Sequence, residues 1–312
     1  PRSADSDGDG IADGDEDLDG DGLANADEQT LGTDPRFVDT DDDGIWDGDE
    51  VTGTDSTNPA SALSPVKDRV LQLDGTGDWL QLPRDLRFAL TDWTIEAWIK
   101  PAAANGDIIA RQTAAGRYNF RLGLNGTLPY VLCTTEDGTD QQLVLPDTAR
   151  VALNQWTHLA ATFDGTTNRL ALYVNGNLTA ARNLAAVCSV NGVGPAQTRV
   201  GEGFAGSVDE VRIWNVVRPA AEIAAARYTN VDPATAGLAA YYRFDDGGDT
   251  AEDFTTTSDW LNDWASAGRL VGNAAMVAAP ADAPLNSEDA DTDGDGLADW
   301  WEQLHFSSLT AA

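Results

Sequence analysis

Four twelve-residue windows with the same pattern of acidic residues constrain this chain more than any other feature of its sequence. They are DSDGDGIADGDE (5–16), DLDGDGLANADE (17–28), DTDDDGIWDGDE (39–50) and DTDGDGLADWWE (291–302). Each has an oxygen-bearing side chain at positions 1, 3, 5, 9 and 12, glycine at position 6, and isoleucine or leucine at position 7. Self-similarity of this kind indicates an array of small repeats.

Acidic side chains at alternate positions around a glycine turn allow a short segment to wrap a calcium ion. Calcium takes about six to eight oxygen ligands in a flexible shell, whereas magnesium prefers an octahedral shell that keeps several waters. The residue at position 7 would add its backbone carbonyl oxygen, and the glutamate at position 12 would close the shell with both carboxylate oxygens. The sequence therefore predicts four calcium sites.

The predicted ligands occupy the same positions in every window, with Asn25 as the only neutral side chain at position 9. They are Asp5, Asp7, Asp9, Ile11, Asp13 and Glu16, then Asp17, Asp19, Asp21, Leu23, Asn25 and Glu28, then Asp39, Asp41, Asp43, Ile45, Asp47 and Glu50, and last Asp291, Asp293, Asp295, Leu297, Asp299 and Glu302. The alternative is an acidic, solvated tail, but random acidity would not repeat the glycine and the aliphatic residue in every window.

The acidic residues are concentrated in two short segments. Residues 1–56 hold 20 acidic and two basic residues, and residues 287–302 hold seven acidic residues and no basic one. The segment between them carries 25 acidic and 17 basic residues, an ordinary globular balance. The net charge of −33 disfavours nucleic acid and anionic membranes as partners, since both attract basic surfaces. No apolar stretch reaches roughly 18 residues, so membrane insertion is not expected.

Between the acidic segments, closely spaced runs of alternating apolar and polar residues predict short β-strands. In RLALYVNG (169–176), three aliphatic residues share one face, and Asn175 with Gly176 predicts a hairpin turn. Only residues 219–228 have a helical pattern, with proline at its start. About a dozen short strands with one helix predict an all-β fold made of two packed sheets.

Cys133 and Cys188 are the only cysteines in the chain. They are too few for a disulfide scaffold, and their spacing does not match a zinc site. A single disulfide and two buried thiols both remain open at this stage.

The acidic windows near the N terminus resemble bacterial thrombospondin type 3-like repeats, in which such loops alternate with phrases like LGTDP (31–35) and TGTD (52–55). The resemblance implies calcium binding, little or no helix after each loop, and a secreted or cell-surface bacterial protein. The window at 291–302 resembles the start of a second array. We therefore expect the chain to be part of a longer multidomain protein.

Four phrases in the middle of the chain resemble the laminin G-like, concanavalin A-like jelly roll. They are VLQLDGTGDWLQLP (70–83), LTDWTIEAWIKP (90–101), NQWTHLAATFDGTTNRLALYVNG (154–176) and GSVDEVRIWNVVRPAAEI (206–223). The resemblance implies a concanavalin A-like two-sheet jelly-roll sandwich. The expected domains are calcium-binding repeats at 1–62, the sandwich at 63–280, and a truncated second array at 281–312.

The jelly-roll resemblance also implies a fifth calcium site. In that family an aspartate after the first strand approaches the aspartate of a GxxDE phrase, and the matching residues here are Asp74 and Asp209. Asp78 is a further candidate ligand. The alternative is that these carboxylates accept hydrogen bonds from nearby backbone N–H groups.

The sequence offers little for catalysis. Glycosidases need two carboxylates across the scissile bond, whereas Glu96 stands alone on its strand. The only histidines are His158, which fits a strand position, and His305. We therefore predict no enzyme activity, no catalytic residue and no cofactor besides calcium.

The tryptophans suggest two further features. Trp260 and Trp264 lie in a polar stretch, where they could form an aromatic binding surface or pack a loop onto a sheet. Trp46, Trp300 and Trp301 lie within acidic windows, and at least one of them is expected to pack against the sandwich or the opposite array.

Together these patterns favour a calcium-binding, non-enzymatic extracellular module. Its jelly roll would serve adhesion or the recognition of a glycan or protein ligand, while calcium makes the flanking repeats rigid. Two alternatives remain: a structural spacer that binds only calcium, and the carbohydrate-targeting module of a large secreted hydrolase.

Overall fold

The structure is a computed structural model that describes residues 5–6, 8, 10–40, 46–52, 59–60, 69–190, 196–245, 250–255, 267–280 and 283–284. The fourth acidic window lies outside the described residues, together with its predicted ligands Asp291, Asp293, Asp295, Leu297, Asp299 and Glu302. The same holds for Asp7, Asp9, Asp41, Asp43, Ile45, Trp260, Trp264, Trp300, Trp301 and His305.

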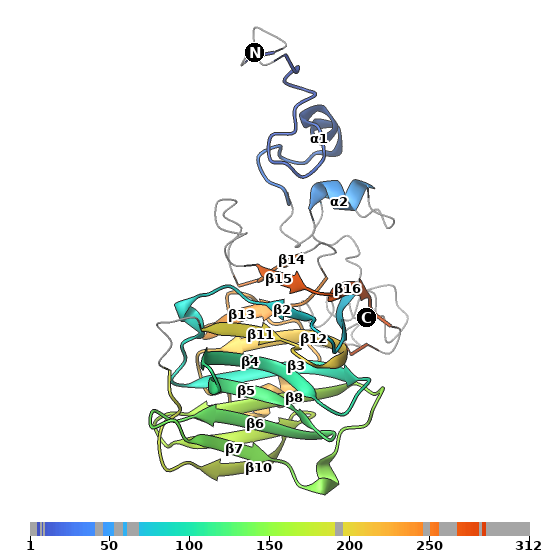
Figure 1. Ribbon diagram of the computed structural model, residues 1–312. Helices are drawn as coiled ribbons and strands as arrows, with labels where there is room; N and C mark the ends of the chain where they lie inside the picture. The colour runs from blue at the N-terminus through green and yellow to red at the C-terminus, as the bar shows by residue number, and fades with distance from the viewer. Residues whose placement is uncertain are drawn as a thin grey trace, which may run out of the picture.

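Two eight-stranded sheets form the body of the molecule, and all of their strand pairs are antiparallel (Figure 1). Sheet A has the order β10–β9–β8–β3–β12–β1–β16, and β13 also pairs with β12. Its strands are β1 (Arg69–Asp74), β3 (Trp93–Pro101), β8 (Thr157–Asp164), β9 (Arg169–Val174), β10 (Asn177–Asn183), β12 (Ala205–Trp214), β13 (Leu238–Tyr242) and β16 (Ala275–Ala278).

Sheet B packs against sheet A and has the order β14–β15–β2–β11–β4–β5–β6–β7. Its strands are β2 (Trp79–Gln81), β4 (Gly106–Ala114), β5 (Arg117–Asn125), β6 (Leu128–Thr134), β7 (Asp140–Val144), β11 (Gln197–Val200), β14 (Thr250–Ala251) and β15 (Gly268–Val271). The predicted all-β, two-sheet sandwich is confirmed.

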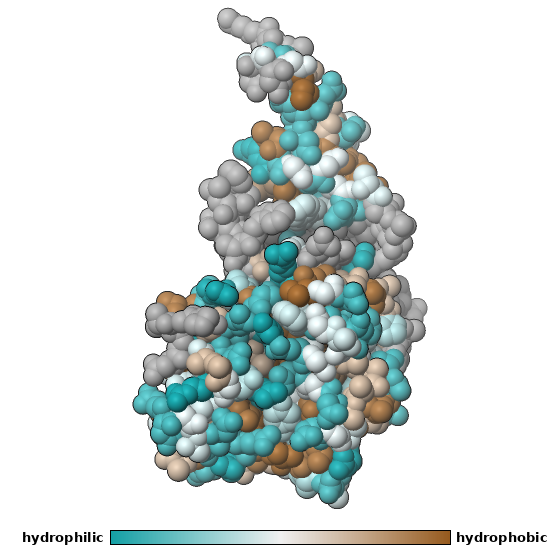
Figure 2. All heavy atoms as spheres, in the orientation of Figure 1, coloured by the Kyte–Doolittle hydropathy of each residue, from teal (hydrophilic) through white to brown (hydrophobic). Residues whose placement is uncertain are grey.

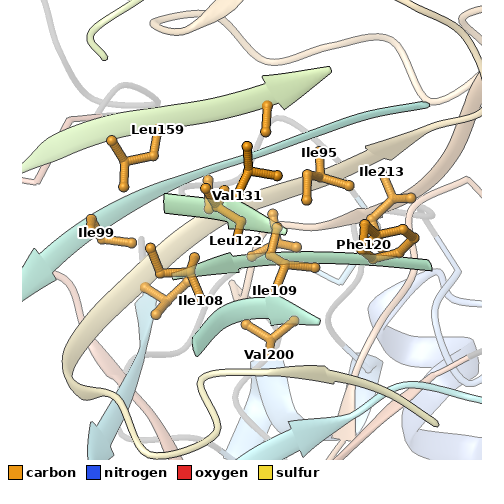
Figure 3. Close-up of a cluster of buried hydrophobic side chains, with 14 of the residues drawn as sticks. Ile95, Ile99, Ile108, Ile109, Phe120, Leu122, Val131, Leu159, Val200 and Ile213 are labelled. Atoms are coloured by element: carbon orange, nitrogen blue, oxygen red, sulfur yellow. The ribbon is translucent and has the colours of Figure 1, made fainter. Parts of the chain in front are cut away.

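The core lies between the sheets and follows the two-residue alternation of the strands. On β3, Trp93, Ile95 and Ile99 are fully buried and meet residues such as Phe120 and Leu122 of sheet B (Figure 3). A fully buried aliphatic or aromatic side chain contributes about 1.5–3 kcal/mol. The expected hairpin turn after β9 also forms, with positive φ at its two central residues.

Sheet A is covered on its outer face as well. Helix α3 (Ala220–Ala226) packs Ile223 there against Ala160, Ala171 and Tyr173. Burial on both faces explains why nearly every residue of β3 is buried, where a half-exposed strand would alternate.

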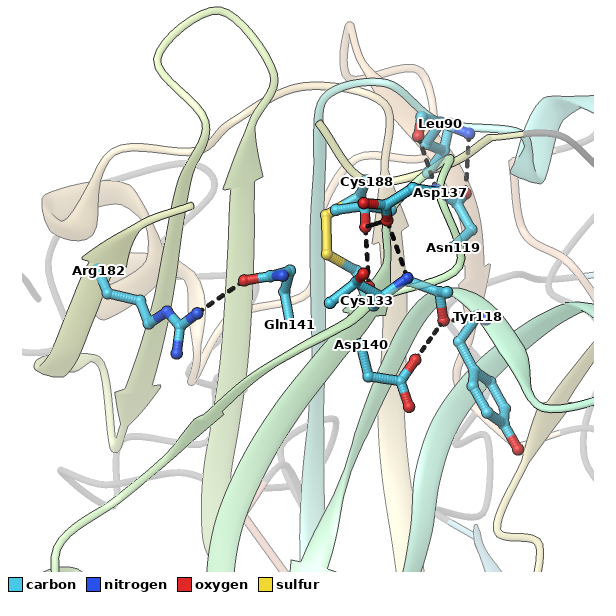
Figure 4. The surroundings of a disulfide bond; sticks show 12 residues. Leu90, Tyr118, Asn119, Cys133, Asp137, Asp140, Gln141, Arg182 and Cys188 are labelled. Carbon is cyan, nitrogen blue, oxygen red and sulfur yellow. Dashed lines mark hydrogen bonds between the residues drawn. A yellow bond between two sulfur atoms is a disulfide. The ribbon is translucent and has the colours of Figure 1, made fainter. Parts of the chain in front are cut away.

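A disulfide joins Cys133 on β6 to Cys188 (Figure 4). The backbone of Cys188 also forms an isolated β-bridge with Thr135. The bond therefore decides between the two possibilities that the sequence left open. It links positions 55 residues apart, and both sulfur-bearing residues belong to the buried core.

The described acidic windows lie beyond the sandwich, past β14 and β15 (Figure 1). They contain two short helices, α1 (Asn25–Leu31) and α2 (Asp47–Thr52). Among the described residues, no helix has the length and apolar character needed to cross a bilayer.

Candidate functional site

The second acidic window brings three predicted ligands together. The carboxylate of Asp17 accepts hydrogen bonds from the backbone N–H groups of Gly20 (2.8 Å) and Gly22 (3.0 Å), so the loop closes on its first residue. Both glycines have positive φ, which a residue with a side chain rarely adopts. Carboxylate oxygens of Asp17, Asp19 and Asp21 consequently lie within 4.8 Å of one another.

Other predicted ligands of this window present oxygen atoms that lack a donor. Asp19 Oδ2, Asn25 Oδ1 and Glu28 Oε2 are buried and accept no hydrogen bond from the described part of the chain. Glu28 is itself fully buried on α1. Buried oxygens without donors are costly unless a cation compensates them. The donor set, which is all oxygen and mostly carboxylate, fits calcium.

The electrostatics of Glu28 agree with this interpretation. Burial, followed by the charges of Asp19, Asp21 and Asp47, raises its pKa to about 7. Burial also raises the pKa of Asp19 and of Asp21. A bound cation would stabilise the ionised carboxylates that the fold otherwise disfavours.

Calcium affinity of the second window should therefore rise with pH. The pKa of Glu28 is higher in the ion-free fold than its ordinary value of 4.5, so the fold holds this proton until the pH passes about 7. Calcium must displace the proton, and its affinity should increase between about pH 5 and pH 8. Titration calorimetry at pH 5 and pH 8 would measure the calcium affinity. The variant Glu28→Gln should bind calcium more weakly, and its affinity should not depend on pH in this range. Equal wild-type affinity at both pH values would contradict the assignment of Glu28.

Neighbouring windows support the second loop from both sides. From the first window, the Glu16 carbonyl accepts from Asn25 N–H (2.8 Å), and the Asp13 carbonyl accepts from Asn25 Nδ2 (2.6 Å). From the third, Gly48 N–H donates to Asp21 Oδ2 (2.8 Å). These bonds connect the described windows into one unit.

The phrase LGTDP has a structural role that the sequence did not reveal. Gly32 ends α1 with a φ of 87°, and its N–H donates to the Glu28 carbonyl. Thr33 Oγ1 then donates to Glu28 Oε1 at 3.4 Å. The phrase thus positions the glutamate at position 12, and this role explains why it follows the loop.

The first and third windows repeat parts of this geometry. Asp5 accepts from the N–H groups of Gly8 (2.7 Å) and Gly10 (3.1 Å), as Asp17 does in the second window. In the third window Asp47 and Glu50 are buried, and Asp47 Oδ1 accepts from Thr40 N–H at 2.8 Å. Two of the remaining described ligands take part in hydrogen bonds: Asp13 accepts from Ser6 N–H, and the buried Leu23 donates its N–H to Asp21. The others differ in exposure, since Ile11 is 49% exposed whereas Glu16 and Asp39 are half-buried.

Gly48 tests the contact between the second and third windows. A Cβ atom there would lie 2.1 Å from the Asp21 carbonyl oxygen, far inside van der Waals contact. Gly48→Ala should therefore push α2 away from the second loop, at a cost of about 1–3 kcal/mol to the array. Gly14, at the same position of the first window, is the matched control, because its nearest neighbour would be Ala26 Cβ at 3.5 Å. Equal calcium titrations and equal helix protection for both variants would contradict the contact.

The register does not bring Asp74 and Asp209, the residues of the expected fifth calcium site, side by side. Asp74 pairs with Ala205 in the ladder between β1 and β12, and Asp209 lies four residues further along β12. Their strand positions are thus about 13 Å apart along the sheet, and the fifth site stays a prediction that the register does not support. Instead, Asp74 accepts from Thr76 N–H, Asp78 accepts from the N–H groups of residues 74 and 75, and Asp209 accepts from the N–H of the next residue.

Glu96 belongs to a buried polar network on the outer side of sheet A. Its Oε1 accepts from Trp214 Nε1 (2.8 Å) and from Arg218 (3.4 Å), and His158 Nε2 lies 3.5 Å from Oε2. Burial would raise its pKa, but His158, Arg212 and Arg218 outweigh burial and lower it to about 2. This cluster joins β3, β8 and β12. Glu96 is fully buried and His158 is 2% exposed, so the cluster is closed to a substrate.

The outer face of sheet B carries a second candidate site. The register aligns one residue from each of β15, β2, β11, β4, β5, β6 and β7, in this order: Arg269, Gln81, Arg199, Ala110, Arg121, Leu132 and Gln142. Each of these residues has at least one chain neighbour that belongs to the core or packs against it, so the row itself faces outward. We call it the arginine row. In Figure 2 strongly hydrophilic side chains run down the middle of this face.

Side chains beside the row hold Arg199 in place. Its Nε donates to Gln81 Oε1 at 3.2 Å, and it forms an ion pair with Glu202. Its guanidinium also lies 4.4 Å from the centroid of the Trp79 ring. The result is a fixed aromatic and cationic pair on a solvent-facing sheet.

Arg121 is held in a similar way. Its Nε donates to both carboxylate oxygens of Asp107, at 2.8 and 2.9 Å, and its guanidinium lies 4.8 Å from the Tyr118 ring centroid. Tyr130 donates its hydroxyl to Asp107 Oδ1 at 2.8 Å. Burial and then the charge of Asp107 raise the pKa of Tyr130, so the phenol remains a donor.

Sequence reasoning missed this second site. Arginine, glutamine and tryptophan at alternate strand positions look like ordinary outward residues, and only the register shows that they align. Three other tryptophans, Trp93, Trp98 and Trp214, are buried. Trp46 is half-buried, and its docking against the sandwich or the opposite array stays a prediction.

Family models of known proteins match segments in both parts of the chain. Residues 74–224 match a family model described as the concanavalin A-like lectin/glucanases superfamily. Residues 5–18, 17–35 and 291–304 match the bacterial TSP3 repeat. No curated protein matches the chain.

Several solved structures are similar to this chain at low sequence identity. A protein from Bacteroides ovatus, provisionally described as carbohydrate-binding, is 20% identical with a TM-score of 0.53, and the match covers 71% of this chain. The chain spans 62% of that protein's length. The CBM40 of a Ruminococcus gnavus sialidase, bound to sialyllactose, is 18% identical with a TM-score of 0.42, covering 50% of this chain and 95% of its own. A pentraxin from Limulus polyphemus is 14% identical with a TM-score of 0.39, covering 52% and 82% respectively.

Proposed function

Because the chain carries a concanavalin A-like domain and bacterial TSP3 repeats, we propose that it is a calcium-binding, non-catalytic extracellular module that recognises carbohydrate. The repeats occupy residues 1–62, the sandwich 63–280 and the start of a second array 281–312. The module works at the surface of, or outside, a bacterial cell as part of a longer multidomain protein. Its disulfide suits an oxidising compartment.

The open face of sheet B is the observation that carries the glycan-binding proposal. Among the described residues, α3 covers sheet A, whereas the outer face of sheet B carries the half-buried Trp79, two held arginines and the glutamines of the arginine row. An aromatic surface with a few oriented polar groups is typical of sites that bind small polar ligands. Sugar rings offer apolar C–H faces and hydroxyl groups that match both kinds of side chain.

Calcium has a structural role in this proposal. In each window the aspartates at positions 1, 3 and 5, the carbonyl at position 7, the side chain at position 9 and the glutamate at position 12 would hold one ion. The ion would supply positive charge to carboxylates that otherwise repel one another. The array would then be a stiff support for the sandwich.

The absence of catalysis is supported by where the acids lie. Glu96 is buried and paired with Trp214, and Asp107 is committed to Arg121 and Tyr130. A glycosidase instead needs two carboxylates that face a substrate with separated pKa values.

A structural spacer is the second candidate function. It is favoured by the hydrogen bonds that join the three N-terminal windows into one unit. Adhesion, as a function of the larger protein, is compatible with either candidate.

A glycan array probed with the whole chain in calcium would test recognition. Binding should fall about tenfold or more in Trp79→Ala, because this ring supports Arg199 and offers the aromatic surface. Trp156→Ala is the matched control, since Trp156 is half-buried next to β8 of the other sheet. Binding to no glycan, or equal loss in both variants, would favour the spacer.

A further inference from the structure

The arginine row is periodic. Arg269, Arg199 and Arg121 lie on β15, β11 and β5, and in each interval one strand stands between them. Adjacent strands are about 4.8 Å apart, so the guanidinium groups start from backbones roughly 10 Å apart. The residues between them are Gln81 and Ala110, which are uncharged.

The three arginines differ in how much of each guanidinium group is left to bind a ligand. Arg121 bonds to the described protein only through Nε, and its side chain is 31% exposed, so its two terminal amino groups face solvent. Arg269 is exposed and makes no hydrogen bond or ion pair within the described ranges. Arg199 is held against Trp79 and by Gln81 and Glu202. Two free guanidinium ends thus flank a fixed one.

The charge of this row is unusual for the chain. The chain carries a net charge of −33, yet the row holds three arginines, which form ion pairs with two acids of the described part of the chain, Asp107 and Glu202. Planar guanidinium groups bind carboxylate and sulfate oxygens in pairs, and preorganisation lowers the entropy lost on binding. Neutral sugars would not need this arrangement.

We propose that the arginine row binds an extended polysaccharide with anionic groups, either uronate carboxylates or sulfate esters, spaced along its chain. This inference rests on the proposed glycan-binding function and names its ligand class. The polymer would run across the strands, with anionic groups at Arg269 and Arg121 and a sugar ring beside Trp79. Duplex DNA fits less well, since it carries one charge per about 1.7 Å, a spacing much denser than the roughly 10 Å between the arginine backbones.

The experiment measures binding of the whole chain, in excess calcium, to oligogalacturonate, heparin-derived oligosaccharides, neutral galacto-oligosaccharides of equal length and duplex DNA. Arg269→Gln is the decisive variant, because this side chain forms no hydrogen bond or ion pair with the described part of the chain. It should weaken anionic binding about tenfold. Arg121→Gln should act similarly, with a melting curve to show that the fold survives. Arg169→Gln, an exposed arginine on β9 of sheet A, is the control.

Each outcome decides the proposal. Anionic binding that Arg269→Gln weakens and Arg169→Gln leaves unchanged supports it, and preference for one oligosaccharide identifies carboxylate or sulfate as the group. Anionic binding insensitive to Arg269 places the ligand on the acidic windows through calcium and overturns it. Preferential binding of neutral glycans, insensitive to Arg269, overturns it while the proposed function stands. If the chain binds no glycan, the proposed function and this inference are both wrong. If it binds DNA as well as the anionic oligosaccharides, the choice of ligand is wrong.

Discussion

Chelation of calcium at about pH 8, above the pKa of Glu28 in the folded array, is expected to unfold the N-terminal windows while the sandwich stays folded. Residues 1–56 hold 20 acidic and two basic residues, and Glu28, Asp47 and Glu50 are buried. Without an ion, repulsion and burial of these carboxylates oppose folding, and the segment has few apolar residues to offset chain entropy. Hydrogen exchange should show amides of α1 and α2 losing protection by several orders of magnitude, with those of β3 and β12 unchanged.

Magnesium is the control for this experiment, because it prefers a smaller octahedral shell and should restore little protection. The variant Glu28→Gln should lower the number of bound calcium ions, whereas the sandwich should melt as before. Equal protection of α1 and α2 with and without calcium would contradict the calcium assignment, and loss of protection in β3 would contradict the independence of the sandwich.

Removal of the disulfide should lower the free energy of unfolding of the sandwich by roughly 4 kcal/mol, the value that chain-entropy reasoning gives for a loop of this length. The bond joins Cys133 to Cys188 across 55 residues. It also ties the segment after β10 to β6, where Thr135 and Cys188 form an isolated bridge. Urea denaturation of the double variant Cys133→Ala/Cys188→Ala would measure the loss.

Wild-type protein unfolded in a thiol reductant is the matched comparison, because it keeps both side chains and loses only the bond. Reductant and double variant should move the urea midpoint in the same direction. A midpoint that neither treatment changes would show that the two cysteines are not bridged in solution.

The acidic loops could be derived from sequence because their geometry is local. Asp17, Asp19, Asp21 and Glu28 lie within twelve residues, so glycine turns and residue spacing suffice to place their oxygens together. The hairpin at Asn175 and Gly176 was predictable for the same reason. Strand alternation is local too, and it indicated a two-sheet sandwich without showing which strands pair.

Tertiary structure alone decided how distant segments align. Register placed Asp74 beside Ala205 and so separated it from Asp209, and register brought Arg269 into one row with Arg121. The same is true of the bond between Cys133 and Cys188 and of the contact between Gly48 and Asp21. Strand alternation reveals which side of a sheet a residue faces, but a shift of two residues keeps every face and moves every neighbour. Lateral alignment depends on packing between segments far apart in the chain, and no local pattern encodes it.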